Sequence, residues 1–140
     1  MKNVPNNASI FTWESEVKDS ELDVQGIVNN SVYFVYMEHC RHKHLKALGL
    51  NVIDIHNDNV DLVVRECTIK FKTSLISGDE FTVSSRWELI NKAKVIVHQN
   101  IIRKSDQNEI VTAAFTVTGI DRNNSKIGLP TTLIDLLNRT

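Results

Sequence analysis

The chain has 140 residues, of which 41% are hydrophobic and 24% charged, and its formal net charge is −1 at pH 7. These totals are typical of one globular domain that buries its own core, and the near-neutral charge excludes a strongly basic surface for nucleic acid or anionic lipid. Two cysteines are too few for a disulfide framework, and no stretch has the apolar length of a signal peptide or a membrane span. We therefore expect a cytoplasmic protein.

The first strand is predicted directly after a short polar lead-in. Residues 1–8 are rich in asparagine and include one proline, which favours a flexible segment, so the single domain is expected to occupy residues 9–140. From residue 9 to residue 17 apolar and polar side chains alternate, which is the period of a half-buried strand.

One long helical pattern follows a polar connection. Apolar residues recur at helical spacing between Tyr33 and Leu48. Asn29 or Asn30 can cap the start of this helix, because a short amide side chain accepts hydrogen bonds from the first free N–H groups. Gly49 is predicted to end the helix, since glycine tolerates the positive φ that a helix terminus often needs.

Four further strand patterns fill the second half of the chain. They cover residues 60–72, 81–90, 94–103 and 109–120, and residues 131–137 are compatible with a terminal helical turn. Residues 51–59 form either a linker or a short extra turn. Short turns join the four strands and require antiparallel pairing, because parallel strands need long crossovers. The order of one strand, one helix and four strands therefore predicts an α+β domain in which a five-stranded antiparallel sheet packs against one helix.

Some apolar surface is left without cover in this arrangement. Val35 lies on the otherwise polar side of the predicted helix, and the strand that begins at Val60 opens with a nearly continuous apolar run. We expect a second subunit to bury these positions, so the protein should be a homodimer or a homotetramer.

Asp23 is the leading candidate for chemistry, because it precedes the start of the predicted helix by a few residues. A carboxylate can act as a nucleophile on an acyl carbon or as a general base for water. The unpaired N–H groups of the helix start can hold the oxyanion that develops in such a reaction. The alternative is an ordinary loop aspartate that the helix dipole stabilises.

The remaining reactive side chains favour structural roles. Three histidines lie in the helical pattern: His39, His42 and His44. His39 and His42 can share a face, whereas His44 falls on the opposite, apolar side, so a third ligand for a metal is missing. We therefore expect a solvated helix surface and no metal site. Cys40 and His44 are four residues apart, which permits a contact, but no acid stands beside them and a packed core cysteine is favoured. Cys67 alternates with apolar residues and is also predicted to lie in the core.

Lys92 and Lys94 make a predicted hairpin locally basic. Such residues are usually solvated charges, but they can also bind the phosphates of a nucleotide-bearing ligand.

The segment D-V-Q-G-I-V-N-N-S-V-Y, residues 23–33, resembles the hotdog-fold acyl-thioesterases of the 4-hydroxybenzoyl-CoA thioesterase family. It is most similar to the branch that includes bacterial acyl-CoA thioesterases and plant acyl-lipid thioesterases. The resemblance extends over about residues 9–138. It implies a hotdog fold, with a five-stranded antiparallel sheet packed around one long central helix.

The resemblance also implies roles for residues of the motif. Asp23 matches the catalytic acid, Gly26 the glycine of the turn, and the backbone N–H of Asn30 the amide that polarises the thioester carbonyl. Tyr33 matches a packing residue near the acyl pocket. Many relatives carry an acid two positions before the catalytic one, and Glu21 holds that place here.

By the same resemblance, the expected activity is hydrolysis of an acyl-CoA or acyl-carrier-protein thioester to free acid and thiol, without a cofactor. Dimers or tetramers of such proteins place each active site between two subunits, and Lys92 and Lys94 then match the region that binds the CoA nucleotide. The alternative is a non-catalytic module that binds acyl thioesters. A hotdog dehydratase or isomerase would need a catalytic histidine in a pattern that this helix lacks.

Overall fold

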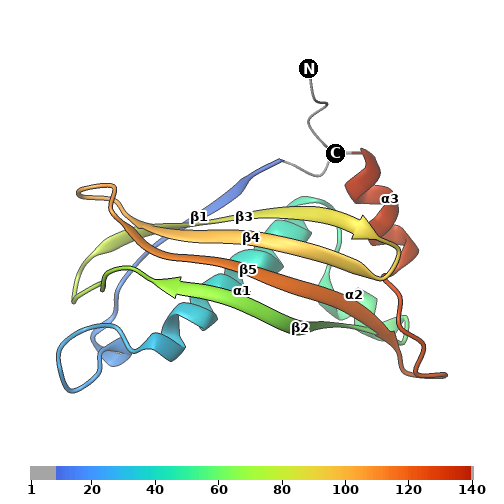
Figure 1. The fold of residues 1–140 in the computed structure, drawn as a ribbon, viewed down its shortest axis with the longest axis horizontal. Coiled ribbons are helices and arrows are strands. Elements are labelled where there is room, and N and C mark those ends of the chain that lie inside the picture. The colour runs from blue at the N-terminus through green and yellow to red at the C-terminus, as the bar shows by residue number, and fades with distance from the viewer. Residues whose placement is uncertain (1–8, 140) are drawn as a thin grey trace.

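The computed structural model describes residues 9–139, so the predicted lead-in at residues 1–8 lies outside the described part. The strands are β1 (Phe11–Glu16), β2 (Val60–Phe71), β3 (Glu80–Asn91), β4 (Lys94–Arg103) and β5 (Glu109–Asp121). The helices are η2 (Asp19–Glu21, a 3-10 turn), α1 (Asn30–Ala47), α2 (Val52–Asn57) and α3 (Thr131–Arg139). The strands form one antiparallel sheet in the order β1-β3-β4-β5-β2, and α1 crosses one face of it (Figure 1). The predicted α+β fold is confirmed, and each predicted strand ends within two residues of the observed one.

The boundaries of α1 follow from the two residue types that flank it. The side chain of Asn29 accepts a hydrogen bond from the backbone N–H of Ser31 at 3.0 Å, so Asn29 is the N-cap. Gly49 follows the helix with a φ of 98°, a conformation that side chains with a Cβ avoid. Both predicted ends are confirmed.

The core lies between α1 and the inner face of the sheet. Side chains alternate between buried and accessible along β3 and β4, as the period of a strand requires. The largest fully buried side chains include Tyr33, Met37, Leu45, Phe81 and Trp87. Each contributes about 1.5–3 kcal/mol through burial, which fixes α1 on the sheet.

The two edges of the sheet are β1 and β2, and this placement exposes part of the inner face. Cys67 in β2 is aligned with Phe115 of β5, yet it is exposed because no element lies beyond β2. The prediction that Cys67 belongs to the core is therefore wrong. Cys40 in α1 is buried, so its predicted core position is confirmed.

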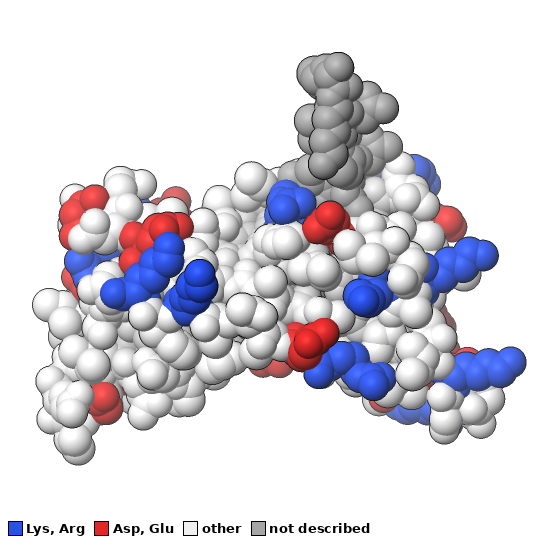
Figure 2. Space-filling view, in the orientation of Figure 1, with Lys and Arg blue, Asp and Glu red and all other residues white. Residues whose placement is uncertain are grey.

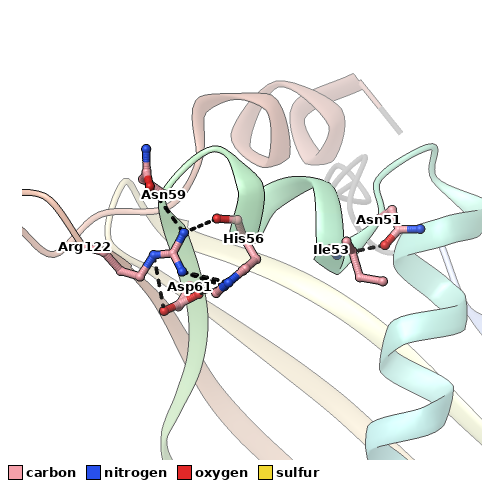
Figure 3. Close-up of polar contacts among 6 residues, drawn as sticks. All are labelled: Asn51, Ile53, His56, Asn59, Asp61 and Arg122. Atoms are coloured by element: carbon pink, nitrogen blue, oxygen red, sulfur yellow. Dashed lines mark hydrogen bonds and ion pairs between the residues drawn. The ribbon is translucent and has the colours of Figure 1, made fainter.

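The segment at 51–59 contains the short helix α2, which the side chain of Asn51 caps by accepting a hydrogen bond from the N–H of Ile53 at 2.8 Å. Polar contacts connect the C-terminal end of α2 to the sheet (Figure 3). His56 Nδ1 lies 2.6 Å from a carboxylate oxygen of Asp61 in β2, and the guanidinium of Arg122 contacts the ring and the carbonyl of His56. These contacts hold α2 beside the start of β2.

Candidate active site at the start of α1

The motif of residues 23–33 folds into a tight loop that leads directly into α1. An isolated antiparallel bridge pairs Leu22 with Val28, so the two ends of the loop lie side by side. Inside the loop, the N–H of Asp23 donates to the carbonyl of Ile27 at 2.8 Å, and the N–H of Gly26 donates to the carbonyl of Asp23 at 3.0 Å. Gly26 has a φ of 80°, so the turn requires the left-handed conformation that glycine adopts at little cost. The loop therefore brings Asp23 close to the helix start.

The carboxylate of Asp23 has one fixed oxygen and one free oxygen. Its Oδ1 atom accepts hydrogen bonds from the backbone N–H groups of Gln25, at 2.8 Å, and Ile27, at 3.4 Å. Its Oδ2 atom has no hydrogen-bond partner within residues 9–139. Because the side chain is only half-buried, this oxygen is available to attack a bound acyl group or to take a proton from water.

The first turn of α1 offers one unpaired backbone donor. The N–H of Asn29 donates to the carbonyl of Glu21 at 3.0 Å, and the N–H of Ser31 donates to the cap side chain. Between them, the N–H of Asn30 has no acceptor in the described part of the chain. This N–H stands at the positive end of the helix dipole, where a negative oxygen is stabilised.

The buried side chain of Tyr33 lies in the first turn of α1 and packs toward the sheet. It is buried, and its hydroxyl accepts a hydrogen bond at 3.0 Å from the N–H of Leu75, in the segment that precedes β3. Its ring lies 6.1 Å from that of Phe71 at the end of β2. Burial raises the pKa of the Tyr33 hydroxyl, so Tyr33 stays neutral. Tyr33 thus joins α1, β2 and the segment before β3 at the place where the motif begins the helix.

Glu21 has a structural role that the sequence did not reveal. Its Oε1 atom accepts a hydrogen bond from the hydroxyl of Tyr36 at 2.7 Å and another from the N–H of Lys18 at 2.8 Å. Burial and the neighbouring Glu21 raise the pKa of Tyr36, which therefore remains a donor. Glu21 and Tyr36 are fifteen positions apart, so no local sequence signal predicts their hydrogen bond. The recurrence of apolar residues predicts only that Tyr36 lies in the helix.

The two lysines lie far from Asp23 in the same subunit. Lys92 and Lys94 are exposed at the β3–β4 hairpin, whereas the Asp23 loop lies near the opposite end of β3 (Figure 1). A strand of 12 residues spans roughly 36 Å at about 3.3 Å per residue. Several Lys and Arg side chains gather at the hairpin end of the molecule, on the right in Figure 2. The structure therefore does not bring the lysines to Asp23 within one chain.

The histidines of α1 do not contribute to this region. His44 is buried against Ser85, and within residues 9–139 no group of three or more His, Cys, Asp or Glu residues is arranged to hold a metal ion. No helix in the same range has the length and apolar character that crossing a bilayer requires.

A curved antiparallel sheet packed around one helix is the hotdog fold of thioesterase-like proteins. The model of the thioesterase-like superfamily matches residues 17–134, and the chain belongs to this superfamily. The resemblance to its 4-hydroxybenzoyl-CoA branch stays a prediction.

Two relatives show how far the similarity extends. The chloroplastic acyl-acyl carrier protein thioesterase ATL3 of Arabidopsis thaliana is 32% identical over 120 residues, which are 86% of this chain and 63% of the plant protein. The chain thus spans less than two thirds of that relative. A putative esterase of Aquifex aeolicus is 25% identical and is matched over 91% of this chain and 97% of its own length.

Among solved structures, a 1,4-dihydroxy-2-naphthoyl-CoA thioesterase from Synechocystis superposes with a TM-score of 0.86 at 17% identity, over 92% of this chain and 96% of that one. At this identity the similarity establishes the fold and not the substrate.

Proposed function

We propose that the protein hydrolyses the thioester bond of an acyl-CoA or acyl-carrier-protein substrate to a free acid and a thiol. The observation that carries this proposal is the pairing of a free Asp23 Oδ2 atom with an unpaired Asn30 N–H at the two ends of one short loop. Membership of the thioesterase-like superfamily, and the names of the relatives, support the same reaction.

In the proposed reaction, the thioester carbonyl oxygen accepts a hydrogen bond from the Asn30 N–H, which stabilises the negative charge of the tetrahedral intermediate. Asp23 can then act in two ways. As a nucleophile, its carboxylate forms an anhydride with the acyl carbon, the thiolate leaves and takes up a proton, and water hydrolyses the anhydride. As a general base, it takes a proton from water while the resulting hydroxide attacks the acyl carbon and expels the thiolate.

The proposed assembly is a homodimer, or a homotetramer built from dimers, in the cytoplasm. β2 is an edge strand, and its inner face exposes Val64, Cys67 and Phe71 beside Phe34 of α1. A two-fold axis beside β2 would cover this apolar surface. It would also place the hairpin end of one subunit beside the Asp23 end of its partner, which gives Lys92 and Lys94 a route to the substrate nucleotide.

The replacement of Asp23 by asparagine tests the proposed chemistry. An asparagine side chain keeps the oxygen that accepts from Gln25 and Ile27, so the loop should persist while the charge is lost. We expect thiol release from acyl-CoA to fall at least ~100-fold, the usual scale for losing a general base. The matched control is Asp19→Asn, because Asp19 lies in the same connection and uses its Oδ1 atom to accept from the Ser77 hydroxyl. The control should keep its activity.

Near-normal turnover by a folded Asp23→Asn variant would rule out the assigned role. If the unaltered protein binds acyl thioesters but releases no thiol from any of them, the protein is a binding module and the enzymatic proposal fails.

A further inference from the structure

Tyr36 is a buried phenol whose ring is packed against three aromatic neighbours. It lies in α1, after Asn30, and its exposed fraction is 4%. The centre of its ring lies 4.4 Å from that of Phe81 in β3, 6.4 Å from that of Trp13 in β1 and 6.2 Å from that of Tyr33. A large side chain that is packed on several sides in a dense core keeps one rotamer. The position of the Tyr36 hydroxyl is therefore set by α1 and the sheet.

This hydroxyl connects α1 to the chain on the far side of the Asp23 loop. It donates a hydrogen bond to the Oε1 atom of Glu21 at 2.7 Å, and Glu21 precedes the bridge that closes the loop. The same Oε1 atom accepts from the N–H of Lys18 at 2.8 Å, and the N–H of Glu21 donates to the carbonyl of Lys18 at 2.9 Å. Hydrogen bonds to a charged group are stronger than those between neutral groups, so Glu21 is firmly held.

The backbone carbonyl of Glu21 continues this connection to the start of the helix. It accepts a hydrogen bond from the N–H of Asn29 at 3.0 Å. Asn29 is the N-cap of α1 and directly precedes Asn30, whose N–H is the unpaired donor of the candidate site. Glu21 is thus bonded to α1 twice, through its side chain and through its carbonyl. A shift of Glu21 would displace Asp23, two residues later, and the helix cap together.

We propose that Tyr36, acting through Glu21, is a positioning residue that holds the Asp23 carboxylate and the Asn30 N–H in their reactive arrangement. Neither Tyr36 nor Glu21 touches the acyl group or the attacking water. Their effect on the rate is geometric, because a misplacement of about 1 Å in a reactive group can cost on the order of 100-fold in rate. This inference rests on the proposed function for its reaction, but it also predicts a change in the loop that needs no turnover.

Tyr36→Phe tests the inference, because it removes the hydroxyl and keeps the ring on Phe81. Glu21 is half-buried, so water can replace the lost donor and the fold should persist. We expect kcat for acyl-CoA hydrolysis to fall on the order of 10- to 100-fold with little change in KM, since the substrate contacts remain. The matched control is Ser85→Ala, which removes another buried hydroxyl beneath α1, the partner of His44. The control should lower the thermal stability and keep its kcat, which separates positioning from stability.

Substitutions of Glu21 separate its geometry from its charge. Glu21→Leu removes the acceptor and should lower kcat as Tyr36→Phe does. Glu21→Gln keeps a side-chain oxygen that can accept from Tyr36 and Lys18, so it should recover most of the kcat that Glu21→Leu loses. Because Glu21→Leu and Tyr36→Phe break the same bond, the double variant should be no slower than either single variant. Losses that multiply in the double variant would show that the two residues act independently, and would overturn the inference.

Hydrogen exchange of the Asn29 amide, followed by NMR, measures the positioning without a reaction. This N–H donates to the carbonyl of Glu21, so Tyr36→Phe should speed its exchange on the order of 10-fold, whereas Ser85→Ala should not. An exchange rate that Tyr36→Phe leaves unchanged would overturn the inference.

The inference and the proposed function fail in different ways. A folded Tyr36→Phe variant with the kcat of the unaltered protein would overturn the inference and leave the proposed function intact. If the unaltered protein releases no thiol from any acyl thioester, the proposed function fails, and the exchange rate of the Asn29 amide alone then decides whether Tyr36 positions the loop.

Discussion

His44 illustrates how a single buried residue makes the stability of this fold depend on pH. The ring is buried, its Nδ1 atom lies 2.5 Å from the hydroxyl oxygen of Ser85, and it stacks on Phe11 with 5.2 Å between ring centres. Burial lowers the pKa of His44 from its ordinary value near 6.5 to about 4. At neutral pH the folded state therefore holds a neutral imidazole.

The stability that depends on His44 should be lost as the pH falls from about 6.5 to about 4. In this window the unfolded chain binds a proton more readily than the folded chain, so the free energy of unfolding decreases. At about 1.4 kcal/mol per pKa unit, the loss is on the order of 3 kcal/mol. Urea unfolding at several pH values measures it. His44→Gln, which lacks the titrating group, should show a flatter pH dependence, and identical slopes for the two proteins would contradict the prediction.

The neighbourhood of His44 also shows what sequence spacing cannot predict about a residue. The separation of four residues permitted a contact between Cys40 and His44. In the structure each one bonds to β3: His44 contacts Ser85, and the thiol of Cys40 donates to the carbonyl of Val83 at 3.5 Å. These partners are more than forty positions away along the chain. Burial raises the pKa of the Cys40 thiol to about 11, so it stays protonated and unreactive.

At the scale of helices and strands, local signals were predictable and neighbours in the sheet were not. The cap at Asn29, the glycine after α1 and the alternation along β3 depend on residues close in sequence, and each was predicted. The spatial order of the strands differs from the chain order, because β1 pairs with β3 and β2 pairs with β5. Sequence alternation cannot identify an edge strand, so it predicts a core position for Cys67, which is exposed in the structure.

The exposed inner face of β2 yields a test of the proposed dimer. Cys67→Asp should cost a single subunit little, because the position is exposed. In a two-fold symmetric dimer that covers this face, each of the two subunits would bury an unpaired carboxylate, at about 3 kcal/mol each. The two penalties together weaken association by about 10⁴-fold. Sedimentation velocity should therefore show dissociation at micromolar concentration.

Thr68→Asp is the matched control for this test. Thr68 is also exposed in β2, but successive side chains of a strand point to opposite faces, so its carboxylate would lie on the outer face. The Thr68→Asp protein should remain a dimer. Equal behaviour of the two variants, or an unaltered protein that is a stable, active monomer, would refute the proposed interface.

At the scale of the whole molecule, the two halves of the proposed substrate site lie at opposite ends of one subunit. Asp23 and Asn30 stand at the start of α1, and the exposed lysines stand at the β3–β4 hairpin (Figure 1). The carbonyl of Lys92 accepts a hydrogen bond from the N–H of Leu129 at 2.8 Å, so the hairpin is fixed to the segment before α3. The motif in the sequence predicts the proposed reactive end, but no motif locates the surface that a second subunit is proposed to complete.

Replacing Lys92 and Lys94 together by alanine should raise KM for acyl-CoA and leave kcat nearly unchanged. Contacts to a remote phosphate stabilise the bound substrate and the transition state equally, so their loss appears in KM. The effect should be larger at low salt, because exposed charges are screened beyond about 8 Å at physiological ionic strength. The double variant Lys43→Ala and Lys46→Ala, which removes two exposed charges from α1, should leave both constants unchanged.

A substrate without the nucleotide separates phosphate binding from other effects of the same lysines. A short acyl-pantetheine keeps the thioester and lacks the phosphates of CoA, so its KM should be the same for the unaltered protein and for the variant without Lys92 and Lys94. An equal rise in KM for acyl-CoA and acyl-pantetheine would show that the lysines act through the hairpin structure and not through phosphate. A variant with unchanged KM for acyl-CoA would mean that the lysines are only solvated, and that the nucleotide binds elsewhere on the dimer.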